Sequence, residues 1–243
     1  MSIRTMLINF FFLPEPFYSN WHHHLETGDF LCPQAFGRNT YEDEEIGVII
    51  RKIYDHFEGN PIAIFEELRT RGFDPGQPNR ILARRCIELA SISVPVRTAF
   101  DQDVEIQSSP RVFLPVIGQW EVLYAMWHEK PAWYARNQGL LTPIWPPLKD
   151  YLGTRGMLLI VKDLAAEHLL RMPILIAHPE HIQRCFFIAR KIFGYSVAID
   201  RDMIRYDIRS FDQGSVQKWT RSSWSWLRYE MMARLHHRLK GWI

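Results

Sequence analysis

A short segment that reads HPEHIQRC combines the residue types of a metal site. His178 follows an apolar run, and His181 lies in the first turn of a helix that the periodicity predicts at Pro179–Phe193. Four residues separate His181 from Cys185, so both lie on one face of that helix. Imidazole and thiolate both bind zinc, and we take His178, His181 and Cys185 as candidate metal ligands. A structural site needs a fourth ligand, which the sequence does not assign, so a buried, inert thiol is the competing interpretation.

Carboxylates offer a second kind of chemistry. Asp200 and Asp202 follow a predicted strand and could bind a divalent cation for phosphodiester chemistry. The turn 153–156 (GTRG) could hold a phosphate with its backbone N–H groups, although it has neither the spacing nor the lysine of a phosphate-binding loop. Neither a dinucleotide-binding glycine pattern nor a nucleophile elbow occurs. We therefore assign no catalytic residue and no resident cofactor beyond zinc or another divalent metal, and we favour a protein that is not an enzyme.

The last thirty residues carry a basic, aromatic pattern. They hold four of the nine tryptophans of the chain, with arginine and lysine between them. Tryptophan and arginine are enriched at interface hot spots, and they also stack on bases and neutralise phosphates. This favours protein partners, and single-stranded nucleic acid or RNA over duplex DNA. The candidate contact residues are Arg205, Arg209, Lys218, Arg221, Trp224, Trp226, Arg228, Arg234, Arg238 and Lys240.

A long amphipathic helix is predicted within residues 214–243. Leu227, Met231, Leu235 and Leu239 recur every four residues, which predicts that this ladder packs on the core while the basic residues face solvent. The alternative for the basic face is internal pairing with the acidic residues 42–45.

Charge and cysteine content bear on the compartment. Residues 1–75 hold twelve acids and six bases, and residues 201–243 hold four acids and nine bases, so the chain is acidic at one end and basic at the other. The three cysteines are widely spaced, which fits a reducing, cytoplasmic location better than a disulfide framework. We find no apolar run long enough to span a bilayer, and we expect no membrane partner.

Three helices are predicted in the first third of the chain, at 40–57, 61–72 and 80–91. Asn60 and Pro61 are typical of the cap and the first residue of the second helix. Because the third helix is basic, a DNA-reading helix-turn-helix is one alternative. Short strands are predicted at 3–13 and 111–117, and in the last third at 157–161, 173–177, 195–199 and 203–208.

These elements predict a mixed α+β fold. We expect a mainly helical N-terminal half with one strand at residues 1–131, an ordered connector rich in proline and aromatic residues at 132–152, and a small α/β half at 153–243 that the long C-terminal helix closes. The three segments could also form one compact domain.

The function that fits these features is that of a non-catalytic subunit of a larger cytoplasmic assembly. Its basic C-terminal surface would bind protein partners and nucleic acid. The alternative is a metal-assisted enzyme that acts on a phosphodiester through His178 and His181, or through Asp200 and Asp202.

Overall fold

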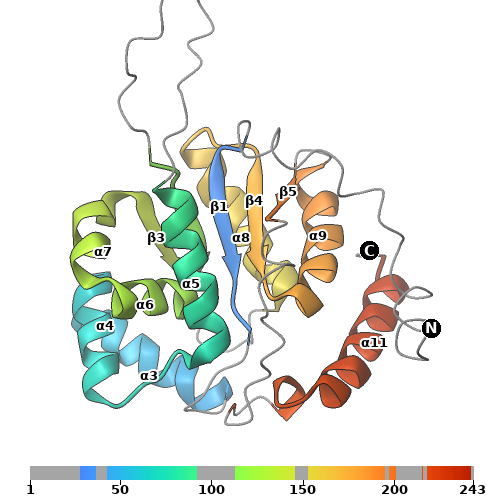
Figure 1. Cartoon of the computed structure of the whole chain (residues 1–243), viewed down its shortest axis with the longest axis horizontal. Coiled ribbons are helices and arrows are strands. Elements are labelled where there is room, and N and C mark those ends of the chain that lie inside the picture. The colour runs from blue at the N-terminus through green and yellow to red at the C-terminus, as the bar shows by residue number, and fades with distance from the viewer. Residues whose placement is uncertain are drawn as a thin grey trace, which may run out of the picture.

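The computed structural model describes residues 28–36, 43–91, 113–145, 153–194, 197–200, 215 and 218–241, with the backbone alone at 43–46 and 219. Five parallel strands form one sheet in the order β3-β2-β1-β4-β5 (Figure 1). The strands are β1 Phe30–Gln34, β2 Val116–Gln119, β3 Leu141–Ile144, β4 Pro173–Ala177 and β5 Ala198–Ile199. The helices are α3 Asp43–His56, α4 Pro61–Thr70, α5 Gly76–Ala90, α6 Trp120–Glu129, α7 Pro131–Asn137, α8 Thr154–Glu167, α9 Pro179–Phe193 and α11 Ser223–Leu239, with short 3-10 turns η2 Gln138–Leu140 and η3 Lys218–Thr220.

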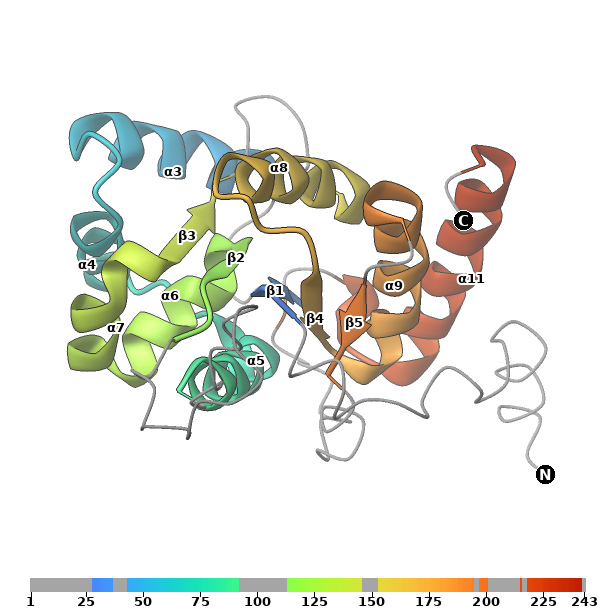
Figure 2. The ribbon, with the colours of Figure 1, turned by 90° about the horizontal axis from the view of Figure 1, so that it is seen from above.

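Helices cover both faces of the sheet. Helices α5 and α6 lie on one side, and α8 and α9 lie on the other (Figure 2). The side chains of β1 alternate between these layers: Leu31 belongs to the core cluster of α5 and α6, whereas Phe30 and Cys32 belong to that of α8 and α9. A parallel sheet with two covered faces has apolar strands on both sides, and all five residues of β1 and of β4 are buried.

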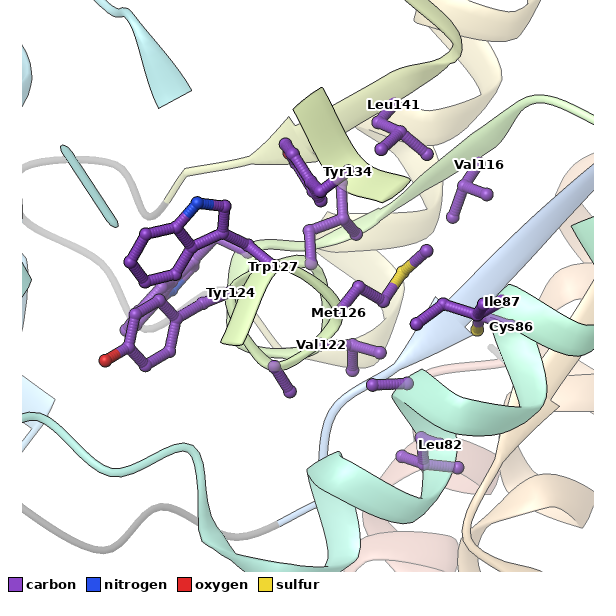
Figure 3. Packing of buried hydrophobic residues seen from close by; sticks show 14 of the residues in the cluster. Leu82, Cys86, Ile87, Val116, Val122, Tyr124, Met126, Trp127, Tyr134 and Leu141 are labelled. Carbon is purple, nitrogen blue, oxygen red and sulfur yellow. The ribbon is translucent and has the colours of Figure 1, made fainter. Parts of the chain in front are cut away.

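Helix α6 is buried on all sides, and its buried residues are apolar except Glu121. Every residue from Trp120 to Trp127 is buried. Figure 3 looks along this helix, with Leu82 of α5 on one side and Val116 of β2 on the other. Tyr124 donates its hydroxyl hydrogen to the carbonyl oxygen of Phe73, 2.9 Å away, so its polar atom is satisfied inside the core.

The sequence-based prediction of a mixed α and β protein is confirmed. Strand β4 and helix α9 have the predicted bounds. Asn60 caps α4 by accepting hydrogen bonds from the N–H groups of Ile62 and Ala63. The predicted strand 157–161 is wrong, because these residues lie inside α8. The predicted strands 3–13 and 203–208 lie outside the described residues.

The arrangement of the halves differs from the prediction. All three predicted segments contribute strands to one sheet: β1 and β2 come from 1–131, β3 from 132–152, and β4 and β5 from 153–243. Strand β1, which was not predicted, lies at the centre of the sheet and pairs with β2 and β4, so residues 1–131 contribute to the same sheet as the rest of the chain.

Strand β1 escaped prediction because it contains Pro33, which lacks the N–H group that a central strand usually donates. Gly118 of β2 lies beside this proline. A Cβ atom on Gly118 would come within 2.5 Å of the Pro33 ring, so only glycine fits there.

Helix α11 turns a different face inward from the one predicted. Trp226, Glu230 and Arg234 are buried, and they follow one another at four-residue steps. Three of the four residues of the predicted leucine and methionine ladder are exposed, with fractions that rise from 36% at Met231 to 80% at Leu239, and Leu227 is half-buried. The prediction that this ladder packs on the core is therefore wrong.

Candidate functional site at the carboxyl edge of the sheet

The carboxyl ends of β1 and β4 mark the point where the chain changes direction across the sheet. The two strands are neighbours. The chain leads from β1 through α3 and α4 to α5, which lies on one face of the sheet, and from β4 directly to α9 on the other face (Figure 2). In open parallel sheets, the crevice between two such diverging connections is where ligands bind.

Side chains from two other elements hold the turn after β1. The N–H of Ala35 donates to Oε1 of Gln119, at the end of β2, over 2.7 Å. The N–H of Phe36 donates to Oδ1 of Asn79 in α5 over 2.9 Å. Asn79 in turn donates through Nδ2 to the carbonyl oxygen of Pro75, so both ends of its amide are in use and its orientation is set. The turn is therefore preorganised by long-range contacts.

Three aromatic rings join β1, β4 and α11 at this edge. The ring of Phe36 stacks on the imidazole of His178, with centroids 3.9 Å apart and planes 9° apart. Trp226 approaches Phe36 edge-on at 4.7 Å. His178 is fully buried at the N-cap of α9, where its Nδ1 accepts the N–H of Glu180. A neutral imidazole that accepts at Nδ1 carries its proton on Nε2.

His181 connects the first turns of α8 and α9. Its Nδ1 lies 3.1 Å from Nη2 of Arg184, and its Nε2 lies 3.4 Å from the hydroxyl of Thr154, the first residue of α8. Arginine can only donate, so Nδ1 is the acceptor and Nε2 carries the proton. Burial lowers the pKa of His181 well below its usual value, and the charge of Arg184 lowers it further. His181 is therefore neutral at pH 7.

Gln34 ends β1 with an unusual environment. Its side chain is 1% exposed. Its Nε2 faces the sulfur atoms of Cys32 at 3.3 Å and Met157 at 3.8 Å, and among the described residues its Oε1 has no hydrogen-bond partner. Met157 lies in the first turn of α8, so the amide is next to the amino end of that helix. A buried amide oxygen without a partner destabilises the folded state by roughly 1–3 kcal/mol. Natural proteins therefore seldom retain such a group unless it has a use.

The charged residues behind the rings carry a net positive charge. Arg184 Nε lies 3.0 Å from Glu230 Oε2, an ion pair without the alignment of a hydrogen bond, and Arg234 Nε donates to Glu230 Oε1 over 2.8 Å. Burial and the charge of Arg184 lower the pKa of His237 to about 4, so this imidazole is neutral at pH 7. The three side chains Arg184, Glu230 and Arg234 sum to one positive charge, with the acid Glu180 in the first turn of α9 as a neighbour of Trp226.

The first turn of α8 adds to this electropositive character. Gly153 precedes the helix and offers no capping side chain, and the first turn holds no acid. The positive end of the helix dipole and its N–H groups attract anions. The predicted phosphate turn 153–156 thus lies at a helix amino terminus, beside Gln34 and His181.

The predicted C-terminal contact residues divide between surface and interior. Trp226 is buried beside His181 of α9, and Arg234 is buried beside Glu230 of α11, which corrects their assignment to a binding surface. Arg205 and Arg209 lie outside the described residues, as do the acidic side chains 43–45 of the internal-pairing alternative. The contact residues that are exposed are Lys218, Arg221, Trp224, Arg228, Arg238 and Lys240.

The predicted metal ligands do not form a metal site by themselves. Among the described residues no three histidine, cysteine, aspartate or glutamate side chains are grouped to hold a metal ion. Cys185 lies in the apolar cluster under α8 and α9, where burial raises the pKa of its thiol. Burial likewise raises the pKa of Cys32 to about 12. Both thiols are therefore protonated at neutral pH and are poor nucleophiles.

Buried and paired charges also change the other predicted sites. Asp200 is fully buried, and Arg85 binds it through two hydrogen bonds of 2.6 and 3.0 Å. Arg84 donates to Glu129 over 2.7 Å, and Arg80 lies 3.3 Å from the same carboxylate. The basic residues of α5 are thus engaged within the fold, and α5 packs on the sheet, which argues against its use as a DNA-reading helix.

Sequence reasoning missed Gln34, Phe36 and Glu230. The first two belong to a strand and turn that a proline concealed, and Glu230 is the single acid of α11, the one signal that could have marked its inward face. Among the described residues, no helix is long and apolar enough to cross a membrane. Comparison of the chain with protein-family models, curated proteins and solved structures found no match.

Proposed function

We propose that the protein binds a small hydroxylated anion, such as a sugar phosphate or a nucleotide, at the carboxyl edge between β1 and β4. The observation that carries this proposal is the fully buried amide of Gln34, whose Oε1 lacks a partner among the described residues. A ligand hydroxyl can donate to an amide oxygen and can also accept from an amide nitrogen, so it satisfies this group in either orientation.

The acidic part of the ligand is inferred from the surrounding charge. The uncapped first turn of α8 adjoins Gln34, and the buried Arg184 lies next to His181 with its guanidinium 3.1 Å from the ring. Phosphate and carboxylate groups bind at helix amino termini for these reasons. Phe36 and His178 stack between the two strands and keep the edge rigid.

Binding is proposed here without a chemical step. The cysteines of the site are protonated, and His181 is held neutral with both ring nitrogens in contact with protein groups. The metal-assisted alternative is less well supported at Asp200, because Arg85 already occupies both of its carboxylate oxygens, and Asp202 lies outside the described residues.

Calorimetric titration with ribose 5-phosphate tests the proposal, with ribose and inorganic phosphate titrated separately. We expect the joined compound to bind more tightly than either part. The substitution Gln34→Leu should weaken binding about 5- to 30-fold, since it removes a buried hydrogen bond worth roughly 1–2 kcal/mol. The protein itself should be as stable as before or more stable, because an unpaired buried amide is replaced by an apolar group.

Gln138→Leu is the matched control, because this half-buried glutamine lies in η2, before β3 begins and away from the carboxyl edge. It should leave binding unchanged. Absence of ribose 5-phosphate binding, or equal binding by Gln34→Leu and the original protein, would contradict the proposed site.

A further inference from the structure

The outward side of α11 displays large apolar side chains. At 100° per residue, they fall within one third of the helix circumference, opposite Trp226 and Glu230. Their exposed fractions of 36–80% are high for a helix that is fixed to the protein by its other side. The residues are Trp224, Met231, Met232, Leu235 and Leu239, and we call them the outer stripe.

The charges around the outer stripe have one sign. Arg228 and Arg238 lie among its residues and are exposed, and Lys240 follows at the end of the helix. The single acid of α11 is Glu230, which is 1% exposed and faces Arg184. The buried ion pairs thus remove the only negative charge of the helix from its outer surface.

Helix α11 also lies where a flat surface can reach it. Figures 1 and 2 both show it on the side of α9 that faces away from the sheet. It is an outermost layer of the described structure, attached through Trp226 and through the ion pair of Glu230 with Arg184 of α9.

We propose that α11 lies on the surface of an anionic lipid bilayer, with the outer stripe inserted among the upper acyl chains and Arg228, Arg238 and Lys240 at the lipid headgroups. Helices that lie in this interface combine tryptophan and leucine on one face with arginine and lysine that reach the headgroups. Phosphates of a nucleic acid would pair with the same cations but would leave the methionines and leucines exposed to water. A bilayer satisfies both features.

This inference differs from the expectation of no membrane partner, which rested on the lack of a spanning segment. A helix that lies along a bilayer does not need the length of a spanning helix, because only one face enters the lipid. The inference is independent of the ligand proposed at the carboxyl edge.

Cosedimentation of the full chain with vesicles tests the proposal. One vesicle is phosphatidylcholine alone, and the other contains about one third phosphatidylglycerol, a composition chosen to give a negative surface potential. We expect binding to the anionic vesicle alone, and weaker binding as salt is added. Arg228→Ala combined with Arg238→Ala should weaken it about 30-fold, from roughly fivefold for each cation near the surface.

The apolar contribution is tested with Met232→Glu combined with Leu235→Glu, which should abolish binding while the unfolding midpoint stays as in the original protein. Leu169→Glu is the matched control, because Leu169 is an 85% exposed leucine just beyond α8, away from α11. It should bind vesicles normally.

Three results would overturn the proposal. The first is absence of binding to the anionic vesicle at low salt. The second is equal loss of binding with Leu169→Glu. The third is evidence that something else covers the outer stripe while vesicles do not bind. Such evidence would be tight binding of single-stranded RNA, or a dimer in size-exclusion chromatography, if the Met232→Glu and Leu235→Glu pair abolishes it.

Discussion

Glu230→Gln is the substitution that best tests how α11 is attached. The carboxylate of Glu230 lies 3.0 Å from Arg184 and 2.8 Å from Arg234, and all three side chains are at most 6% exposed. The amide keeps the shape of the side chain but removes the negative charge that both buried arginines face. Removing one partner of a buried ion pair costs about 3–5 kcal/mol.

This cost should fall on α11 alone. The remaining contacts of the helix centre on Trp226, whose burial contributes roughly 2–3 kcal/mol. Because every 1.4 kcal/mol is a factor of ten, a cost of about 3–5 kcal/mol should make the amide hydrogens of α11 exchange about 140- to 3,700-fold faster in Glu230→Gln. The amides of β1 and β4 should be unchanged, since local openings of a peripheral helix need not involve the core.

Hydrogen exchange followed by mass spectrometry gives the exchange rates of α11 and of strands β1 and β4 from one sample. Glu67→Gln is a close control, because Glu67 also pairs with an arginine four residues later, Arg71, at 2.7 Å, but at the surface. Its effect should be within about 1 kcal/mol. Unchanged exchange in α11 would refute the attachment by buried charge, and equal acceleration throughout the sheet would show that α11 does not open separately.

Three further expectations concern the rest of the fold. Gly118→Ala should destabilise the protein by about 1–3 kcal/mol or more in urea unfolding, since the new methyl group overlaps a proline ring. The control Gly139→Ala should have little effect, because there is open space around Gly139. Equal effects of the two substitutions would contradict the close approach of the strands. Asp200→Asn should cost up to about 3–5 kcal/mol, because it removes the buried carboxylate that pairs with Arg85 and leaves the half-exposed Glu88 as the remaining acid 2.9 Å from this arginine; a loss below 1 kcal/mol would mean that water reaches the pair. His237 has a pKa of about 4 in the folded protein and about 6.5 in the unfolded chain. The unfolded chain therefore binds more protons between these pH values, so the free energy of unfolding should fall as the pH drops from 6.5 to 4. His237→Gln should reduce this slope, and an unchanged slope would assign it to other groups.

Local signals predicted the helices well. Asn60 and Pro61 marked the start of α4, and the prolines at the first positions of α4 and α9 coincide with their observed beginnings. Caps act within one turn of the chain, so the sequence alone contains the physics that they need. The apolar run that forms β4 was also evident, because both faces of a central parallel strand are buried.

Strand β1 and helix α8 show where local reasoning failed. In β1 the proline argued against a central strand, and only the glycine opposite in β2, more than eighty residues away, makes room for it. In α8 a short apolar run fits a buried strand or a buried helix equally well. The sheet decided between them, since residues 154–167 cover its face between β3 and β4.

The sequence by itself showed which segments are amphipathic and which are fully apolar, and it showed at which residues most helices begin. It also showed that α11 carries aromatic, apolar and basic residues together. Only the tertiary structure decided which side of α11 is buried. Periodicity identifies an apolar stripe, but the free energy of burial depends on the surface against which the helix packs. Here the Trp226 ring packs edge-on against Phe36, and Glu230 forms an ion pair with Arg184. The same long-range contacts placed Gln34 beside the first turn of α8, because the carboxyl edge is assembled from segments more than a hundred residues apart.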